Sequence, residues 1–149
     1  MTTLYPPVFN GSYGYTNEWE RASLIIGESI ISCNLKFVAD GFKNDLYSYL
    51  FGMPPAYHGI DNLYTYYDGG AVAANDVTTV GNRTIAVVLQ DLITSFTENG
   101  VPTADGVRQF SKYGTDNRVL LLSNSTDFRE VRDQTSSSRC SWWQTVEYS

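Results

Sequence analysis

The chain has 149 residues, of which 42% are hydrophobic and 14% aromatic, so it is long and apolar enough for one folded domain and is not disordered. The formal net charge of −6 argues against nucleic acids and anionic membranes as partners, because an acidic surface repels both. No apolar run is expected to be long enough to cross a bilayer, and the first fifteen residues lack the basic start and apolar stretch of a signal peptide.

The first third of the chain predicts helix after an irregular start over residues 1–17. A helical stretch begins at Glu18 and is expected to break at Gly27. A second helix follows to about Lys43, because apolar residues recur at helical spacing opposite a polar face. These residues are expected to form a buried stripe: Ile31, Leu35, Val38 and Phe42.

An aromatic-rich segment over residues 46–53 predicts a short strand that is buried on both faces. Pro54 and Pro55 end this strand, since proline cannot donate to a ladder of hydrogen bonds. The loop after them holds His58, the only histidine of the chain.

The second half predicts one long helix over about residues 84–98, with a firm stop at Asn99-Gly100. Residues 118–123 read as a second short strand, and residues 133–148 as a terminal helix. The apolar face of the long helix comprises Ile85, Val88, Leu89, Leu92 and Phe96. Two isolated strands cannot cover two long helices, so either they pair with each other in a small α+β unit or the rest of their sheet lies elsewhere.

Candidate catalytic and metal-binding groups are few. The segment "GESII" begins like a nucleophile elbow, but Ile31 stands where the second glycine is needed, so Ser29 is rejected as a nucleophile. Two cysteines, Cys33 and Cys140, with one histidine are too few for a structural zinc site, and no cofactor is expected. The cysteines are either two buried thiols or one disulfide.

An isolated histidine is more often structural than catalytic. The position of His58 favours catalysis, because its loop leaves the end of a strand and is stiffened by prolines before it and a glycine after it. Asp61 either holds this loop through backbone N–H groups or forms an Asx-turn. It is too close in sequence to be the acid that orients the imidazole.

Three N-x-S/T sequons, at Asn10, Asn82 and Asn124, favour a secreted origin when they occur beside an even cysteine count and few lysines. The missing signal peptide contradicts that origin.

Five segments, in order, resemble the C-terminal part of a type-B carboxylesterase/lipase, the cholinesterase-like branch of the α/β-hydrolases, and secreted fungal members in particular. The segments are "ERASLIIGESIISCNLKFVADGF", "YSYLFGMPPAYHGIDNLYTYY", "LQDLITSFTENGVPTADGVRQFSKYG", "RVLLLSN" and "RCSWWQTVEY". The resemblance covers nearly all of residues 1–149. It implies an α/β-hydrolase fold of which this chain holds mainly helices, two or three short strands and an incomplete sheet.

The resemblance implies specific roles for three residues. His58 matches the histidine of a Ser–Glu/Asp–His triad, and Cys33 and Cys140 match a family disulfide. In the chain-entropy model, this disulfide would contribute about 4–5 kcal/mol to the free energy of unfolding, because it closes a very long loop. The nucleophile, the acid and the oxyanion hole precede the histidine in this family, and there is no room for them before His58. The chain is therefore expected to be inactive alone, and to need the N-terminal part of the fold as its partner.

For the complete protein, the resemblance implies an ester or lipid substrate and an extracellular location, with the signal peptide in the N-terminal part. The alternatives are a non-catalytic cholinesterase-like binding or adhesion module, a decayed gene product or truncated gene, and a small free-standing glycoprotein. Tyr57 and Tyr64, on either side of the histidine loop, face the substrate or the core, and the core is favoured.

Overall fold

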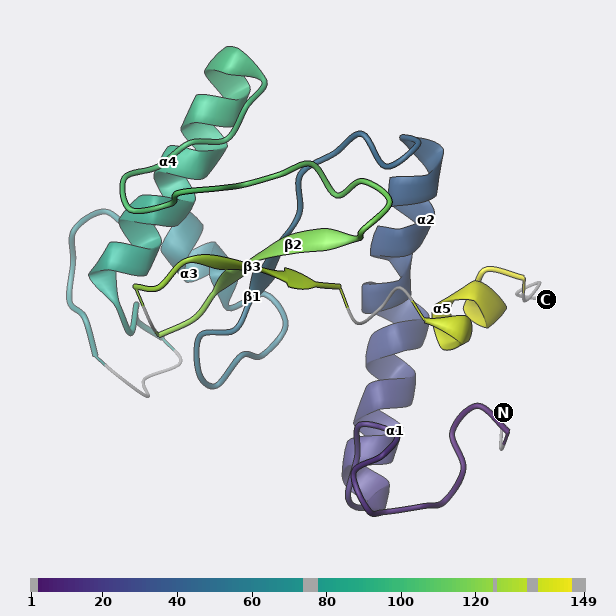
Figure 1. Cartoon of the computed structure of the whole chain (residues 1–149). Coiled ribbons are helices and arrows are strands. Elements are labelled where there is room, and N and C mark those ends of the chain that lie inside the picture. Colours follow the sequence, from purple (N-terminus) through teal and green to yellow (C-terminus); the bar gives the residue numbers. More distant parts are fainter. Residues whose placement is uncertain (1–2, 74–77, 125, 134–136, 146–149) are drawn as a thin grey trace. The chain divides into compact units, whose positions relative to one another are not determined.

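The computed structural model describes residues 3–73, 78–124, 126–133 and 137–145, shown in Figure 1. The chain divides into two compact units. Unit 1 comprises Met1–Asp45 and Asp133–Ser149, and unit 2 comprises Leu46–Arg132. Unit 1 is helical among the described residues, whereas unit 2 holds the three strands of the sheet and two helices.

Unit 1 contains one helical run made of α1 (Glu18–Gly27), the π-helical turn η1 (Glu28–Ser32) and α2 (Cys33–Gly41). Asn17 caps its start by accepting a hydrogen bond from the Glu20 N–H. The expected break at Gly27 is wrong, because Gly27 has helical dihedral angles, φ −59° and ψ −45°. A glycine weakens a helix by about 1 kcal/mol without ending it, and the chain here passes into a π-turn instead.

The predicted buried stripe of this run is also wrong. Ile31, Val38 and Phe42 are exposed by 41%, 46% and 65%, and the buried residues are Glu28, Cys33 and Ala39. Helix α5 (Ser138–Trp143) contacts η1 and α2. Helix α5 thus packs on the face of the helical run that carries Cys33, and the face that carries Ile31, Val38 and Phe42 stays exposed.

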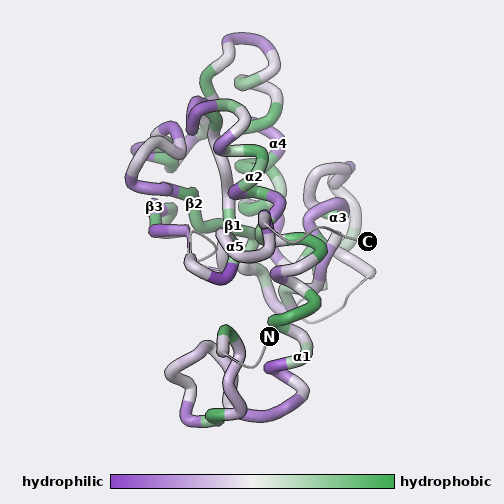
Figure 2. Tube along the Cα trace, turned by 90° about the vertical axis from the view of Figure 1, so that its right-hand side faces the viewer, coloured by the Kyte–Doolittle hydropathy of each residue, from purple (hydrophilic) through white to green (hydrophobic). Residues whose placement is uncertain are grey.

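By length and composition, the 24-residue run Glu18–Gly41 is apolar enough to cross a membrane. This corrects the expectation that no such run exists. Several turns of the run are hydrophobic in Figure 2. However, Glu28 lies near its middle as a buried, ion-paired carboxylate, and Cys33 is bonded to α5. The ion pair of Glu28 and the disulfide of Cys33 are contacts of a helix that packs against another part of the protein.

The core of unit 1 is built around a disulfide between Cys33 and Cys140, which are 107 residues apart in sequence. The pairing implied by the resemblance is therefore present. Both cysteines are buried together with Tyr5, Tyr15 and Trp143. Helix α5 is shorter than the predicted terminal helix, and residues 134–136 and 146–148 of that prediction lie outside the described residues.

Beside the disulfide, Glu28 is the centre of a buried polar network. Its carboxylate accepts a hydrogen bond from the Tyr5 hydroxyl at 2.6 Å and pairs with Arg139, whose Nη2 lies 2.7 Å from Oε1. The Trp143 Nε1–H donates in turn to the Tyr5 hydroxyl at 2.7 Å. A buried carboxylate is costly unless it is paired and hydrogen-bonded, and Tyr5 and Arg139 meet that condition for Glu28.

The network alters two pKa values. Burial, followed by the hydrogen bond to Glu28, raises the pKa of Tyr5 to about 12. Burial lowers the pKa of Arg139, but the hydrogen bonds and charge of Glu28 outweigh it, so that this pKa is raised on balance. The folded unit therefore holds the Tyr5 proton more tightly than the unfolded chain does.

Unit 2 contains a three-stranded sheet in the order β1-β2-β3. Strand β1 (Tyr49–Phe51) runs parallel to β2 (Arg118–Leu122), and β3 (Arg129–Arg132) runs antiparallel to β2. The two strands expected from the sequence therefore pair with each other, and β3 is the third. Within the described ranges no strand pairs with the other edge of β1, and Leu50 is 50% exposed. The expectation that this strand is buried on both faces is wrong.

Helix α4 (Arg83–Asn99) covers the sheet and supplies most of the core of unit 2. Gly100, at φ +73°, ends it as the sequence predicts, and Asn82, which was not predicted as a cap, caps its start. Of the predicted apolar face, Phe96 is 49% exposed and the other members are buried. Hydrophobic residues recur along α4 in Figure 2.

Replacing both cysteines, as Cys33→Ser with Cys140→Ser, should lower the free energy of unfolding of unit 1 by about 4–5 kcal/mol, because the unfolded chain regains the entropy of a very long loop. Urea denaturation followed by tryptophan fluorescence measures this, since all three tryptophans (Trp19, Trp142 and Trp143) lie in unit 1. The NMR signal of His58 in unit 2 serves as the control. An unchanged urea midpoint of tryptophan fluorescence would contradict this prediction.

The stability of unit 1 should fall as the pH rises from about 10 to about 12. Because the pKa of Tyr5 is raised in the folded state, the unfolded chain loses the phenol proton at a lower pH than the folded chain does. The stabilisation from the protonated Tyr5 is therefore complete below pH 10 and is lost as the pH rises through about 12. Urea midpoints at pH 9 and pH 11, again from tryptophan fluorescence, should differ more in the native protein than in Tyr5→Phe. An equal pH dependence in the two proteins would refute the assignment to Tyr5.

Candidate functional site

The loop that carries His58 begins where β1 ends. Pairing with β2 continues one residue past the strand, because the Gly52 N–H donates to the Leu122 carbonyl at 2.7 Å. Met53 then enters the core of unit 2 and is only 2% exposed. The chain thus leaves the sheet from a fixed point. The Pro54-Pro55 bond, next along the chain, is cis.

His58 occupies a tight turn between Tyr57 and Ile60. The Ile60 N–H donates to the Tyr57 carbonyl at 3.2 Å, and Gly59 at the third position has φ +83°, as a type II turn requires. Ile60 is buried, with 8% exposure, whereas His58 is exposed. Met53 and Ile60 therefore anchor the two ends of a loop that presents the imidazole outward.

The imidazole of His58 makes no hydrogen bond or ion pair with any residue that the structure describes. The same residues contain no group of three or more histidine, cysteine, aspartate or glutamate side chains able to hold a metal ion. The described part of the chain thus offers a presented base, without a nucleophile or an acid beside it.

Asp61, the first residue of α3 (Asp61–Thr65), makes no hydrogen bond or ion pair with His58 but accepts a hydrogen bond from the Tyr49 hydroxyl at 3.0 Å. The sequence predicted that Asp61 would bond to backbone N–H groups of the loop or form an Asx-turn, and neither prediction included Tyr49 as a partner. Burial, followed by the bond to Asp61, raises the pKa of Tyr49 to about 12. Strand alternation places residues 49 and 51 on one face of the strand, but it does not indicate Asp61 as the partner of Tyr49.

The two tyrosines on either side of the loop have different environments. Tyr64 is 1% exposed, as expected for the core, and its hydroxyl accepts a hydrogen bond from the Gly81 N–H at 2.9 Å. Tyr57 is 67% exposed, so its expected place in the core is wrong. Its position next to His58 on an outward-facing loop explains this exposure.

The rejection of Ser29 agrees with its geometry. This serine lies inside η1, and its hydroxyl donates back to the Ile26 carbonyl at 3.1 Å. A serine bonded along its own helix is not presented as a nucleophile.

The three sequon asparagines lie at described positions. Asn10 is exposed, and its side chain accepts a hydrogen bond from the Ser12 N–H at 3.0 Å. Asn82 caps α4 and also donates to the side chain of Asn124 at 3.3 Å. Asn124 is exposed, whereas Ser125 of its sequon lies outside the described residues. Glycosylation of these sites stays a prediction.

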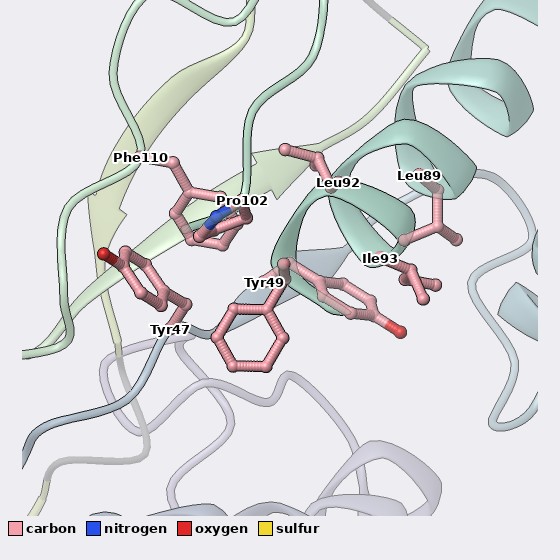
Figure 3. A pocket seen from close by; sticks show the side chains of 8 residues that line it. Tyr47, Tyr49, Leu89, Leu92, Ile93, Pro102 and Phe110 are labelled. Atoms are coloured by element: carbon pink, nitrogen blue, oxygen red, sulfur yellow. The ribbon is translucent and has the colours of Figure 1, made fainter. Parts of the chain in front are cut away.

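An apolar groove of about 140 Å³ lies between β1 and α4, shown in Figure 3. Tyr47 packs edge-to-face against Phe96 of α4 and against Phe110, with ring centroids 5.9 and 5.5 Å apart. Tyr49 also lines the groove. Strand β1 therefore borders the groove through Tyr49, and its second edge carries no paired strand among the described residues.

Comparison with known proteins gives two related sequences. The chain is 31% identical over 145 residues, or 97% of its length, to carboxylesterase patB of Penicillium expansum. It is 33% identical over 147 residues, or 99% of its length, to carboxylesterase patB of Aspergillus clavatus. The chain spans about a quarter of the length of each of these curated relatives.

No family model matches the chain, and no solved structure matches it. The relationship therefore rests on sequence identity along the whole chain. It agrees with the resemblance carried by the five segments. The chain is homologous to carboxylesterases over nearly all of its length.

Proposed function

We propose that this chain is the part of a serine carboxylic-ester hydrolase that supplies the histidine base, and that His58 is this base. The observation that carries the proposal is the presentation of the only histidine, on an anchored loop at the exit of a strand, in a chain homologous to carboxylesterases. An exposed imidazole without partners in the described residues is available to groups that lie elsewhere in a complete enzyme.

The chemistry required of His58 is set by ester hydrolysis. The imidazole takes the proton of a serine hydroxyl as the oxygen attacks the ester carbonyl, and returns it to the departing alcohol. It then takes a proton from the water that hydrolyses the acyl-enzyme. An acid must hold the imidazole in one tautomer. Asp61 is engaged by Tyr49, so the proposal assigns this acid, the serine and the oxyanion donors to sequence outside this chain.

The partner in this proposal is the remainder of an α/β-hydrolase fold. Its docking surface on unit 2 is the edge of β1 together with the apolar groove beside it. Support comes from the 50% exposure of Leu50 and from the rings that line the groove. The length of the relatives beyond the matched quarter also supports it. An additional strand would satisfy backbone groups of β1 and cover this apolar surface.

The proposal includes secretion of the complete protein. The disulfide between Cys33 and Cys140 supports it, because such bonds form and persist in oxidising compartments. The exposed sequon asparagines Asn10 and Asn124 are accessible to glycosylation in that setting.

A chimera tests the role of His58. The segment of the Penicillium expansum carboxylesterase that matches this chain is replaced by the chain, and hydrolysis of a chromogenic short-chain ester is measured. His58→Ala should lower kcat on the order of 10⁴-fold or more, because the base of a triad is lost. Tyr66→Ala, at an 80% exposed position of the same unit, is the matched control and should leave kcat unchanged. The isolated chain should show no turnover.

Two outcomes would oppose the proposal. Retention of activity by the His58→Ala chimera would remove His58 as the base, and turnover by the isolated chain that depends on His58 would refute inactivity alone. If the chimera does not fold, alanine at the position aligned with His58 in the Penicillium expansum enzyme tests the same role. A native-like activity of that variant would argue against the aligned histidine, and with it His58, as the base.

A further inference from the structure

Helix α3 is attached to strand β1 at two points. Strand alternation directs Tyr49 and Phe51 to one face, and both reach α3. The Tyr49 hydroxyl donates to Asp61 at 3.0 Å, and the Phe51 ring packs edge-to-face on Tyr64, with centroids 4.8 Å apart. The loop that carries His58 joins β1 to α3. These two contacts therefore hold together the strand before the loop and the helix after it.

The two attachment points differ in how much else supports them. Near Tyr64, the side-chain amide of Gln90 in α4 donates to the carbonyls of Tyr64 and Tyr67 at 3.2 and 2.8 Å, and the Gly81 N–H donates to the Tyr64 hydroxyl. At the other end, next to His58, the bond from Tyr49 is the side-chain hydrogen bond that ties residues 52–61 to the sheet among the described residues. The N-terminal end of α3 is therefore held mainly by the hydrogen bond from Tyr49 to Asp61, whereas several contacts support the region around Tyr64.

We propose that Tyr49 and Asp61 are positioning residues for His58, and that their hydrogen bond fixes the start of α3 against β1 and so limits the orientations of the imidazole. A hydrogen bond to a carboxylate is stronger than one between neutral groups. The raised pKa of Tyr49 agrees with this role, since the phenol keeps the proton that it donates. The effect on catalysis rests on the proposed function, whereas positioning itself is measurable without any catalysis.

The isolated chain provides the first test. Tyr49→Phe keeps the ring in the groove and removes only the donor. Hydrogen exchange should become about 3- to 10-fold faster at Ala56, Ile60 and Asn62, the amides that bond within the loop, and remain unchanged in α4. The single imidazole signal of His58 should shift or broaden in the NMR spectrum. Tyr66→Phe, which removes an exposed hydroxyl from the same unit, should change neither reading.

Substitution of the acceptor separates the hydrogen bond from a general loss of stability. Asp61→Ala should reproduce the faster exchange, and the double variant with Tyr49→Phe should exchange no faster than either single variant, because both remove the same bond. Asp61→Asn keeps an acceptor oxygen and should retain most of the protection. Additive effects of the two single variants, or unchanged loop exchange in Tyr49→Phe, would overturn the inference.

The chimera provides the catalytic test. Tyr49→Phe should lower kcat about tenfold with KM unchanged, since a misoriented base affects the transition state and leaves substrate binding intact. Faster loop exchange with an unchanged kcat would overturn the positioning role. Activity that survives His58→Ala would instead refute the proposed function, whatever the loop exchange shows, so the two failures are distinguishable.

Discussion

The parallel pairing of β1 with β2 is the interaction on which the arrangement of unit 2 depends. It joins Leu50 to Leu121 across the sheet and brings the start of the unit next to its end. Strand β1 is only three residues long, so its place is also held by the two residues after it, because Gly52 bonds to β2 and Met53 is buried. These contacts fix the direction in which the chain leaves the sheet and so fix where the histidine loop begins. An imidazole is useful as a base only when it is held in place, so this pairing supports the role that we propose for His58.

Unit 1 depends on a different constraint, since its residues come from both ends of the sequence. A covalent bond and a buried ion pair, formed by neighbouring residues of α5, hold the terminal segment to the long helical run. Arg139 reaches Glu28, while Cys140 reaches Cys33, one π-turn further along the same run. The π-helical turn starts at Glu28, and the same residue is buried against the Tyr5 hydroxyl. An isolated charge would be costly there, but the pairing makes this buried position compatible with a stable unit.

Local signals predicted much of the structure, and tertiary contacts explain where they failed. The C-terminal stop of α4 and most of its buried face were predicted because periodicity and Asn99-Gly100 indicate the same element, whereas the cap at Asn82 was not predicted. The buried stripe of the first helical run was predicted wrongly because an apolar face is buried only where a neighbour covers it, and the neighbour here is α5 on the Cys33 side. The place of the His58 loop after a strand was predicted correctly, whereas the catalytic role of His58 stays a prediction. The contact of Tyr49 with Asp61 was not predicted, since it depends on how α3 returns to β1.

The uncovered side of β1 has a consequence for handling the protein in solution. Among the described residues no strand pairs with one edge of β1, and Leu50 is exposed. Such an edge is a template on which another polypeptide can add, and natural proteins usually shield it with charges, prolines or bulges. Strand β1 has none of these within Tyr49–Phe51. Samples of this chain are therefore prone to concentration-dependent self-association and aggregation through that edge, and dilute conditions suit spectroscopy of the monomer.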